Sequence, residues 1–120
     1  MTTPPTTTYN RGDVVLVPFQ FSDRPVFKRR PAIIVSSDAF HAGRRDVIIA
    51  AITSRIREPL LAGDQMIIRW QECGLPKPSV ATAILRTVKD AMIVRRIGAL
   101  AKEDLRPLDA SLTVSLGLSV

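Results

Sequence analysis

Residues 28–38 read Lys28-Arg29-Arg30-Pro31-Ala32-Ile33-Ile34-Val35-Ser36-Ser37-Asp38. The apolar part, residues 32–35, is short, rich in β-branched side chains and closed by polar residues, which predicts a buried central strand. Pro31 suits the first position of such a strand, because its missing N–H then breaks no ladder bond. A proline also holds the residue before it in an extended conformation. The stretch therefore predicts a fixed arginine, Arg30, at the mouth of a rigid strand.

Further short segments along the chain have the pattern of strands: residues 14–19, 47–52, 66–68, 79–88 and 93–97. We expect residues 20–31 to form a surface loop and residues 38–46 a loop or a single helical turn. Leucines at three- and four-residue steps predict an amphipathic helix that starts near Lys102 and ends before Gly117, with Pro107 removing one helical bond. The chain is therefore expected to be mainly β, a small barrel closed by a C-terminal helix.

The length of 120 residues predicts one domain. Residues 1–10 are rich in threonine and proline and are expected to be a disordered tail, with residues 11–120 as the single folded domain. The Arg-Gly-Asp tripeptide at residues 11–13 is interpreted as a turn that feeds a strand rather than as an adhesion motif.

Charge favours an anionic partner. The net charge is +6, and 13 of the 17 cations are arginine, whose planar fork matches phosphate and carboxylate groups. Nucleic acid, an acidic protein and a membrane surface all fit this balance, and a basic surface without a specific partner is the alternative. No apolar run approaches membrane-spanning length, and no signal region is evident, so we expect a cytoplasmic protein that does not bind membranes.

Few residues suit conventional catalysis. His41 is the only histidine, so no serine–histidine or histidine–metal constellation is evident. Acidic residues never recur with ligand spacing, and we expect neither a metal nor a cofactor. The single cysteine, Cys73, excludes an internal disulfide and is interpreted as a small buried residue rather than a nucleophile.

The candidates that remain for a functional site are arginine and hydroxyl side chains. Arg30 opens one predicted central strand, and Thr53 and Ser54 close the next. If these strands pair antiparallel, the start of one and the end of the other lie at the same end of the sheet, which would bring the three residues together. The alternative is that Thr53 and Ser54 only terminate a strand by turn bonding.

Such a group of residues suits RNA cleavage, because RNA carries its own nucleophile, the 2′-hydroxyl. A protein then has only to align that hydroxyl with the adjacent phosphate and to stabilise the transition state. A fixed guanidinium can donate two hydrogen bonds to phosphate oxygens, and a threonine hydroxyl can donate a third. Arginine does not readily deprotonate and so is not suited to remove the proton of the 2′-hydroxyl. No other general base is evident in the sequence.

Seven collinear blocks within residues 9–118 resemble the MazF/PemK toxins of bacterial toxin–antitoxin systems: residues 11–17, 29–40, 50–54, 77–80, 86–88, 95–100 and 102–105. Each block is weakly specific alone, whereas the ordered set is highly specific. The resemblance implies a small SH3-like, partly open β-barrel with a C-terminal helix, a homodimer, and metal-independent ribonuclease activity on single-stranded RNA. It also implies neutralisation by an acidic segment of a cognate antitoxin.

The resemblance carries over to individual residues. The family's arginine before the strand-opening proline corresponds to Arg30, and its threonine in the Ile-Thr-Ser segment to Thr53, with Ser54 in the same motif. These three are the catalytic candidates. The RNA-binding candidates are the cations nearby and one in the strand at 79–88: Lys28, Arg29, Arg55 and Arg86.

One departure concerns the strand at residues 79–88. Some members of the family carry an Arg-x-Asp set there, whereas this strand has no acid and no cation before Arg86. A base from that strand is therefore lacking, and Asp23 in the preceding loop is the candidate substitute.

The sequence as a whole predicts an endoribonuclease toxin that leaves a 2′,3′-cyclic phosphate and a 5′-hydroxyl. Two alternatives remain: a non-catalytic toxin of the same fold that poisons a protein such as gyrase, and a basic nucleic-acid-binding module.

Overall fold

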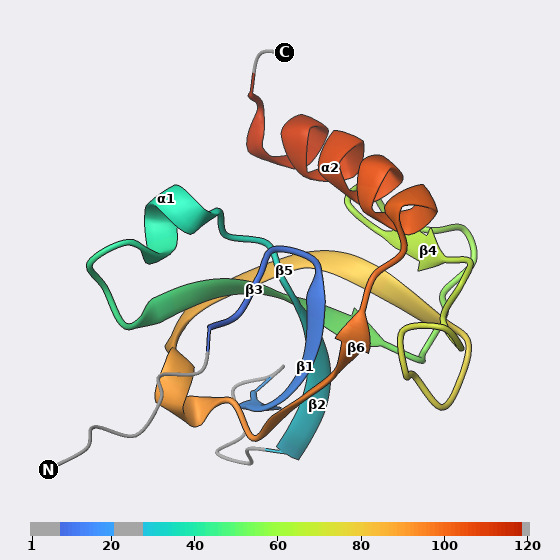
Figure 1. Ribbon diagram of the computed structural model, residues 1–120. Helices are drawn as coiled ribbons and strands as arrows, with labels where there is room; N and C mark the ends of the chain where they lie inside the picture. Colours follow the sequence, from blue (N-terminus) through green and yellow to red (C-terminus); the bar gives the residue numbers. More distant parts are fainter. Residues whose placement is uncertain (1–7, 21–27, 119–120) are drawn as a thin grey trace, which may run out of the picture.

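The computed structural model describes residues 8–20 and 28–118 (Figure 1). Its elements are β1 (Asp13–Phe19), β2 (Lys28–Ile34), α1 (Asp38–His41), β3 (Asp46–Thr53), β4 (Gln65–Ile67), β5 (Ser79–Lys89), the short 3-10 helix η1 (Asp90–Met92), β6 (Arg95–Ala99) and α2 (Lys102–Leu116). The predicted fold class is confirmed: a mainly β chain forms a curled half-barrel, and a C-terminal helix packs on it.

One antiparallel sheet contains every strand in the order β4-β5-β3-β2-β1-β6. Its two faces bury different sets of side chains, because successive residues of a strand point to opposite faces. The helix-side cluster packs under α2 and includes Ile33, Ile52 and Leu108. The far-side cluster occupies the other face and includes Val17, Phe19, Ala32, Ile34, Ile49 and Ala51.

The expected loop at residues 20–31 is wrong at its C-terminal end, because β2 begins at Lys28 rather than at the apolar run. The cause is long-range pairing: β1 extends to Phe19, and its backbone pairs with residues 28–30, including Val17 with Arg30. Pro31 is tolerated inside β2 because pairing with β3 begins only at Ala32, so the strand is paired on one side at that point. Arg30 therefore lies within a strand and not at its mouth.

Smaller differences occur elsewhere. Strand β6 starts two residues later than expected, since residues 90–92 form η1 and Val94 donates its N–H to the carbonyl of Leu16. The helix starts at Lys102 as predicted, and Gly117 ends it in the left-handed conformation with φ of 69°. No helix among the described residues is long and apolar enough to cross a membrane.

Two expectations fall on segments that the structure describes only in part. Residues 1–7 of the expected tail and the loop at 21–27, with Asp23, lie outside the described residues. Tyr9, near the end of the expected tail, is half-buried against the far-side cluster.

A bulge bends β5 where it crosses β3. The register moves from Ala50 opposite Leu85 to Ile52 opposite Ala81, and bulges of this kind bend and twist a strand. The buried hydroxyl of Thr82 donates to the carbonyl of Ala51 at 2.8 Å and accepts the N–H of Ile84 at 3.2 Å. The Thr82 hydroxyl therefore forms hydrogen bonds with backbone groups that lack a regular partner at the bulge.

We expect Thr82→Val to lower the free energy of unfolding by about 1–2 kcal/mol, because the buried carbonyl loses its donor while the volume is kept. Urea denaturation measures this. Thr87→Val is the matched control, since Thr87 is exposed on the same strand. Equal midpoints for the two variants would contradict the role assigned to Thr82.

Candidate active site

Arg30 and Thr53 lie on the neighbouring strands β2 and β3, each two residues beyond the point where the ladder between these strands ends. Arg30 pairs with Val17 of β1, and Thr53 pairs with Val80 of β5. The ladder between β2 and β3 ends at Ala32 opposite Ala51. Continued by two residues, that register sets Arg30 opposite Thr53, where Cβ atoms of facing residues are about 5 Å apart. We call Val17, Arg30, Thr53 and Val80 the Arg30 row.

The row belongs to the face of the far-side cluster. Ala32 and Ala51 both lie in that cluster, and Arg30 and Thr53 are each two residues away from one of them. Arg30 is half-buried, and its Nε atom is buried. Val17 is 0% exposed and Val80 is 2% exposed. Apolar walls on both sides lower the local dielectric constant and so strengthen the attraction of a guanidinium for an anion.

Thr53 has a local bond as well. Its Oγ1 accepts the N–H of Arg55 at 3.1 Å, which is the turn bonding considered above as an alternative. A hydroxyl that accepts one bond keeps its proton to donate elsewhere, so turn bonding and phosphate binding are compatible at Thr53. Ser54 and Arg55 are exposed beyond the strand end.

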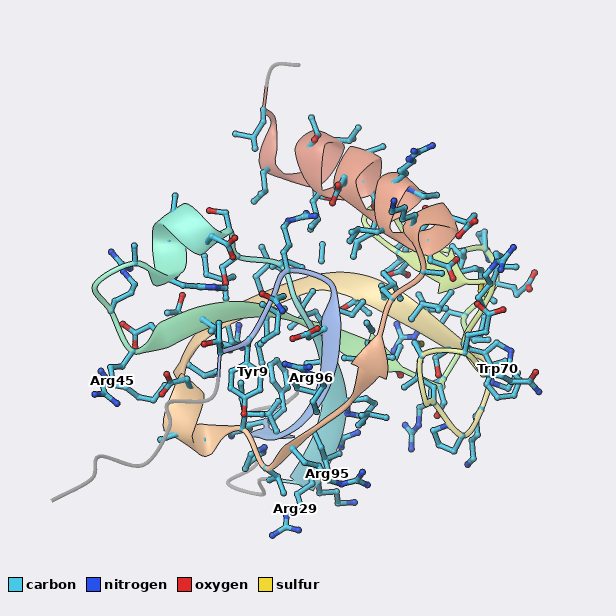
Figure 2. All side chains as sticks on the ribbon, viewed as in Figure 1. Tyr9, Arg29, Arg45, Trp70, Arg95 and Arg96 are labelled. Carbon is cyan, nitrogen blue, oxygen red and sulfur yellow. The ribbon has the colours of Figure 1, made fainter. Side chains whose placement is uncertain are left out.

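Cations gather at the end of the sheet where β1 and β3 finish and β2, β5 and β6 begin. This basic end comprises Lys28, Arg29, Arg30, Arg55, Lys77 and Arg95, which lie in or within two residues of the strand ends. Figure 2 shows Arg29 and Arg95 projecting at the bottom of the view, away from Arg45. Alternation places Lys28 on the face of Arg30 and Arg29 on the opposite face.

The basic end differs in charge balance from the opposite end of the sheet. Within the part of the chain that the structure describes, Lys28, Arg29, Arg55 and Arg95 form no ion pair, and all four are exposed. At the opposite end, acids and cations pair with each other, for example Asp46 with Lys89 at 3.4 Å. An anionic ligand is therefore drawn to the basic end.

Arg86 lies on β5 opposite Ile49, on the face of the sheet that carries the far-side cluster. Its guanidinium carbon lies over the Phe19 ring, 5.6 Å from the centroid, and its Nη1 donates to the carbonyl of Leu85 at 3.0 Å. Arg86 was expected to bind RNA, whereas nothing in the sequence indicates that Phe19 is its neighbour.

His41 lies in α1, which follows the far end of β2. Its partner Ser36 lies six residues beyond Arg30, which corresponds to about 20 Å along an extended chain. Its Nε2 lies 2.5 Å from the Ser36 hydroxyl, which accepts the N–H of Ile48 at 2.9 Å. This contact joins α1 to β3 and stands apart from the Arg30 row.

Cys73 is buried, as expected from the sequence. Burial raises the pKa of the Cys73 thiol, and its Sγ donates to the carbonyl of Trp70 at 3.3 Å. A thiol held in this way is a poor nucleophile. Among residues 8–20 and 28–118, no three His, Cys, Asp or Glu side chains gather as metal ligands.

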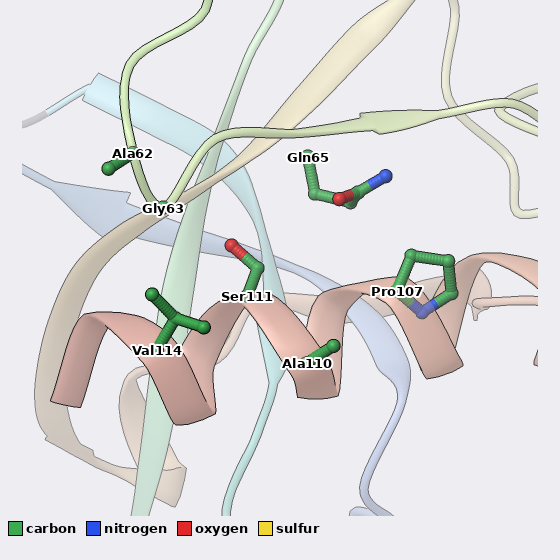
Figure 3. A pocket seen from close by; sticks show the side chains of 7 residues that line it. All are labelled: Ala62, Gly63, Gln65, Pro107, Ala110, Ser111 and Val114. Atoms are coloured by element: carbon green, nitrogen blue, oxygen red, sulfur yellow. The ribbon is translucent and has the colours of Figure 1, made fainter. Parts of the chain in front are cut away.

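A groove of about 360 Å³ lies between α2 and the segment that leads into β4 (Figure 3). Small and apolar side chains line it, including Gly63, Ala110 and Val114. No cation lines the groove, and it adjoins the helix that covers the other face of the sheet. The groove therefore offers no positive charge to a phosphate.

A family model and several solved structures match this chain. A family model described as PemK-like, MazF-like toxin of type II toxin–antitoxin systems matches residues 10–116. Among solved structures, the Mycobacterium tuberculosis toxin MazF-mt6 is 21% identical with a TM-score of 0.73, over 90% of this chain and 99% of that chain. An endoribonuclease in complex with its cognate antitoxin, from a mycobacterial species, is 18% identical with a TM-score of 0.75, over 94% and 99%.

A MazE–MazF structure from Deinococcus radiodurans is also similar, with 18% identity and a TM-score of 0.73 over 95% of this chain and 100% of that chain. At these identities the structural likeness shows the fold.

Proposed function

The chain belongs to the PemK-like, MazF-like toxin family of type II toxin–antitoxin systems, and from this premise we propose that it is an endoribonuclease that cuts single-stranded RNA without a metal ion. The observation that carries the proposal is the Arg30 row. Arg30 is half-buried and pairs with the buried Val17, Thr53 pairs with the buried Val80, and the register of β2 with β3, if continued by two residues, would bring the guanidinium and the hydroxyl together. A phosphate between the two polar groups would meet several donors at once.

In the proposed reaction the 2′-oxygen of one nucleotide attacks the adjacent phosphorus. The bond from phosphorus to the 5′-oxygen breaks, which leaves a 2′,3′-cyclic phosphate on one fragment and a 5′-hydroxyl on the other. Arg30 donates to the non-bridging oxygens, whose charge increases as the attack proceeds, and Thr53 donates from the neighbouring strand. Donors fixed before the reaction stabilise this charge without reorganising, which is the main source of rate enhancement in such sites.

Proton transfer in this scheme goes through water. The 2′-hydroxyl loses its proton, and the departing 5′-oxygen gains one. The positive charge of Arg30 favours the ionised 2′-oxygen, because an opposite charge nearby stabilises an anion. Asp23, the candidate base from the sequence, lies outside the described residues.

The other cations of the basic end would bind the phosphates on either side of the cleaved linkage. Lys28 shares the face of Arg30, and Arg55 lies two residues beyond Thr53 and donates its backbone N–H to the Thr53 hydroxyl. Arg29 points to the opposite face, so it would contact RNA that turns over the end of the sheet. These exposed charges also suit an acidic antitoxin segment, and a similar endoribonuclease was solved with its cognate antitoxin. We propose that such a segment blocks the same surface of a homodimer in the cytoplasm.

The test is incubation of the purified protein with a long transcript in EDTA, with the cut sites mapped by primer extension. We expect discrete fragments that recur at the same sequence. No cleavage would overturn the proposal. Protein capture of gyrase without RNA cleavage would favour a protein-poisoning toxin. RNA affinity that falls steeply with salt, without growth arrest on expression, would favour a simple basic binding module.

A further inference from the structure

Two uncharged groups orient Arg86, which lies on β5 opposite Ile49 of the far-side cluster. The Leu85 carbonyl accepts from Nη1 at 3.0 Å, and the guanidinium carbon lies over the Phe19 ring. Within the described residues Arg86 forms no ion pair, so its charge is not neutralised there. The side chain is exposed, whereas Phe19 is 3% exposed. The buried aromatic ring thus supports the guanidinium of a side chain that is itself exposed.

This support lies close to the Arg30 row. Phe19 pairs with Lys28 and is two residues beyond Val17, and Val17 is a member of the row. Two residues of a strand span about 7 Å. Both Val17 and Phe19 belong to the far-side cluster, so they lie on the same face. A nucleotide next to the cleaved linkage would therefore come within reach of the Arg86 guanidinium.

We infer that Arg86 contacts a nucleobase beside the cleaved phosphate, rather than a phosphate as the sequence suggested, and that it sets the base preference at that position. The inference rests on the proposed function and deepens it. A planar cation with one side on an aromatic ring offers its other side to an unpaired base, and arginine planes stack on bases in single-stranded RNA. Hydrogen-bond donors of the guanidinium other than Nη1 would be available to bases with acceptor atoms, because only Nη1 bonds Leu85.

A phosphate-binding role predicts a different behaviour. Phosphate contacts depend on charge and are shared by every sequence, whereas base contacts depend on the planar fork. Lysine keeps the charge but has no plane to stack and no fork to donate. Arg86→Lys therefore separates the two roles, and because Arg86 is exposed the substitution leaves the core intact.

The experiment measures binding and cleavage with RNA oligonucleotides in which each position flanking the cut carries each of the four bases. Binding uses versions with a 2′-O-methyl group at the cut nucleotide, which cannot react. Arg86→Lys is expected to reduce the preference between best and worst base at one flanking position by on the order of tenfold. The salt dependence of binding should stay as in the wild type, because the charge is kept. Arg45→Lys, exposed at the other end of the sheet, should change neither quantity.

A second variant tests the support. Phe19→Leu keeps an apolar side chain in the far-side cluster but removes the ring, and it should weaken the same preference at the same position. The inference is overturned if Arg86→Lys keeps the wild-type preference at every position, or if the wild type shows no base preference beside the cut. Affinity for a randomised pool of 2′-O-methyl oligonucleotides needs no mapped cut, so a wild type that never cuts RNA would remove the proposed function alone: a base preference in the pool that Arg86→Lys abolishes would support the inference, and one that it leaves unchanged would overturn it.

Discussion

Replacing Arg30 by alanine is expected to reduce the rate of RNA cleavage by about 10³-fold, the loss typical when a fixed donor to a developing oxyanion is removed. Arg30 is half-buried beside the fully buried Val17, and water that replaced its side chain could not reproduce two directed, charged hydrogen bonds. Arg30→Lys keeps the charge but not the fork, and should also cut slowly. Initial rates with one oligonucleotide that contains a mapped cut site, measured in EDTA, give the ratio.

The fold of each variant has to be checked, because Arg30 lies within β2. Circular dichroism and thermal melting serve for this, and Arg45→Ala is the control for loss of a surface cation. Cleavage by a folded Arg30→Ala variant at the wild-type rate would remove Arg30 from the reaction.

Replacing Asp104 by alanine is expected to lower the free energy of unfolding by about 3 kcal/mol, since two hydrogen bonds to a charged group are lost at a buried site. Asp104 lies in the first turn of α2 and is 2% exposed. Its carboxylate accepts the N–H of Ile68 at 2.8 Å and the N–H of Arg69 at 2.9 Å. It therefore joins the start of the helix to the chain just after β4.

Urea denaturation followed by far-UV circular dichroism measures this change. Glu103→Ala is the matched control, because Glu103 is the preceding residue and its exposed carboxylate makes only a 4.0 Å contact with Arg69. It should shift the free energy of unfolding by less than about 0.5 kcal/mol. If the two variants unfold at the same urea concentration, the carboxylate of Asp104 does not hold the helix.

The strands and the helix could be predicted from the sequence because their signals are local. Runs of β-branched residues such as 47–52 mark buried strands, and leucines at helical spacing mark α2. The start of β2 could not be predicted in this way. Three cations and two nearby prolines have the composition of a loop, and only pairing with β1 makes residues 28–30 a strand.

The candidate site shows the same division. The antiparallel pairing of the strands that carry Arg30 and Thr53 could be predicted from their order along the chain, and the structure contains this pairing over residues 32–34 and 49–51. The neighbours of Arg86 could not be predicted from the sequence. They depend on the bulge in β5 and on the curl of the sheet, which brings Phe19 of β1 next to Arg86 of β5. Asp104 was also missed, since its partners are backbone groups 35 and 36 residues away and carry no sequence signal.

The most direct measurement compares two RNA oligonucleotides that contain a mapped cut site and differ only by a 2′-O-methyl group on the nucleotide 5′ to the cut, with the products identified by mass spectrometry. If the Arg30 row aligns the 2′-hydroxyl with the adjacent phosphate, the unmodified RNA gives a 2′,3′-cyclic phosphate and a 5′-hydroxyl, and the methylated RNA stays intact. Cleavage of the methylated RNA, or a 5′-phosphate on the product, would contradict this account.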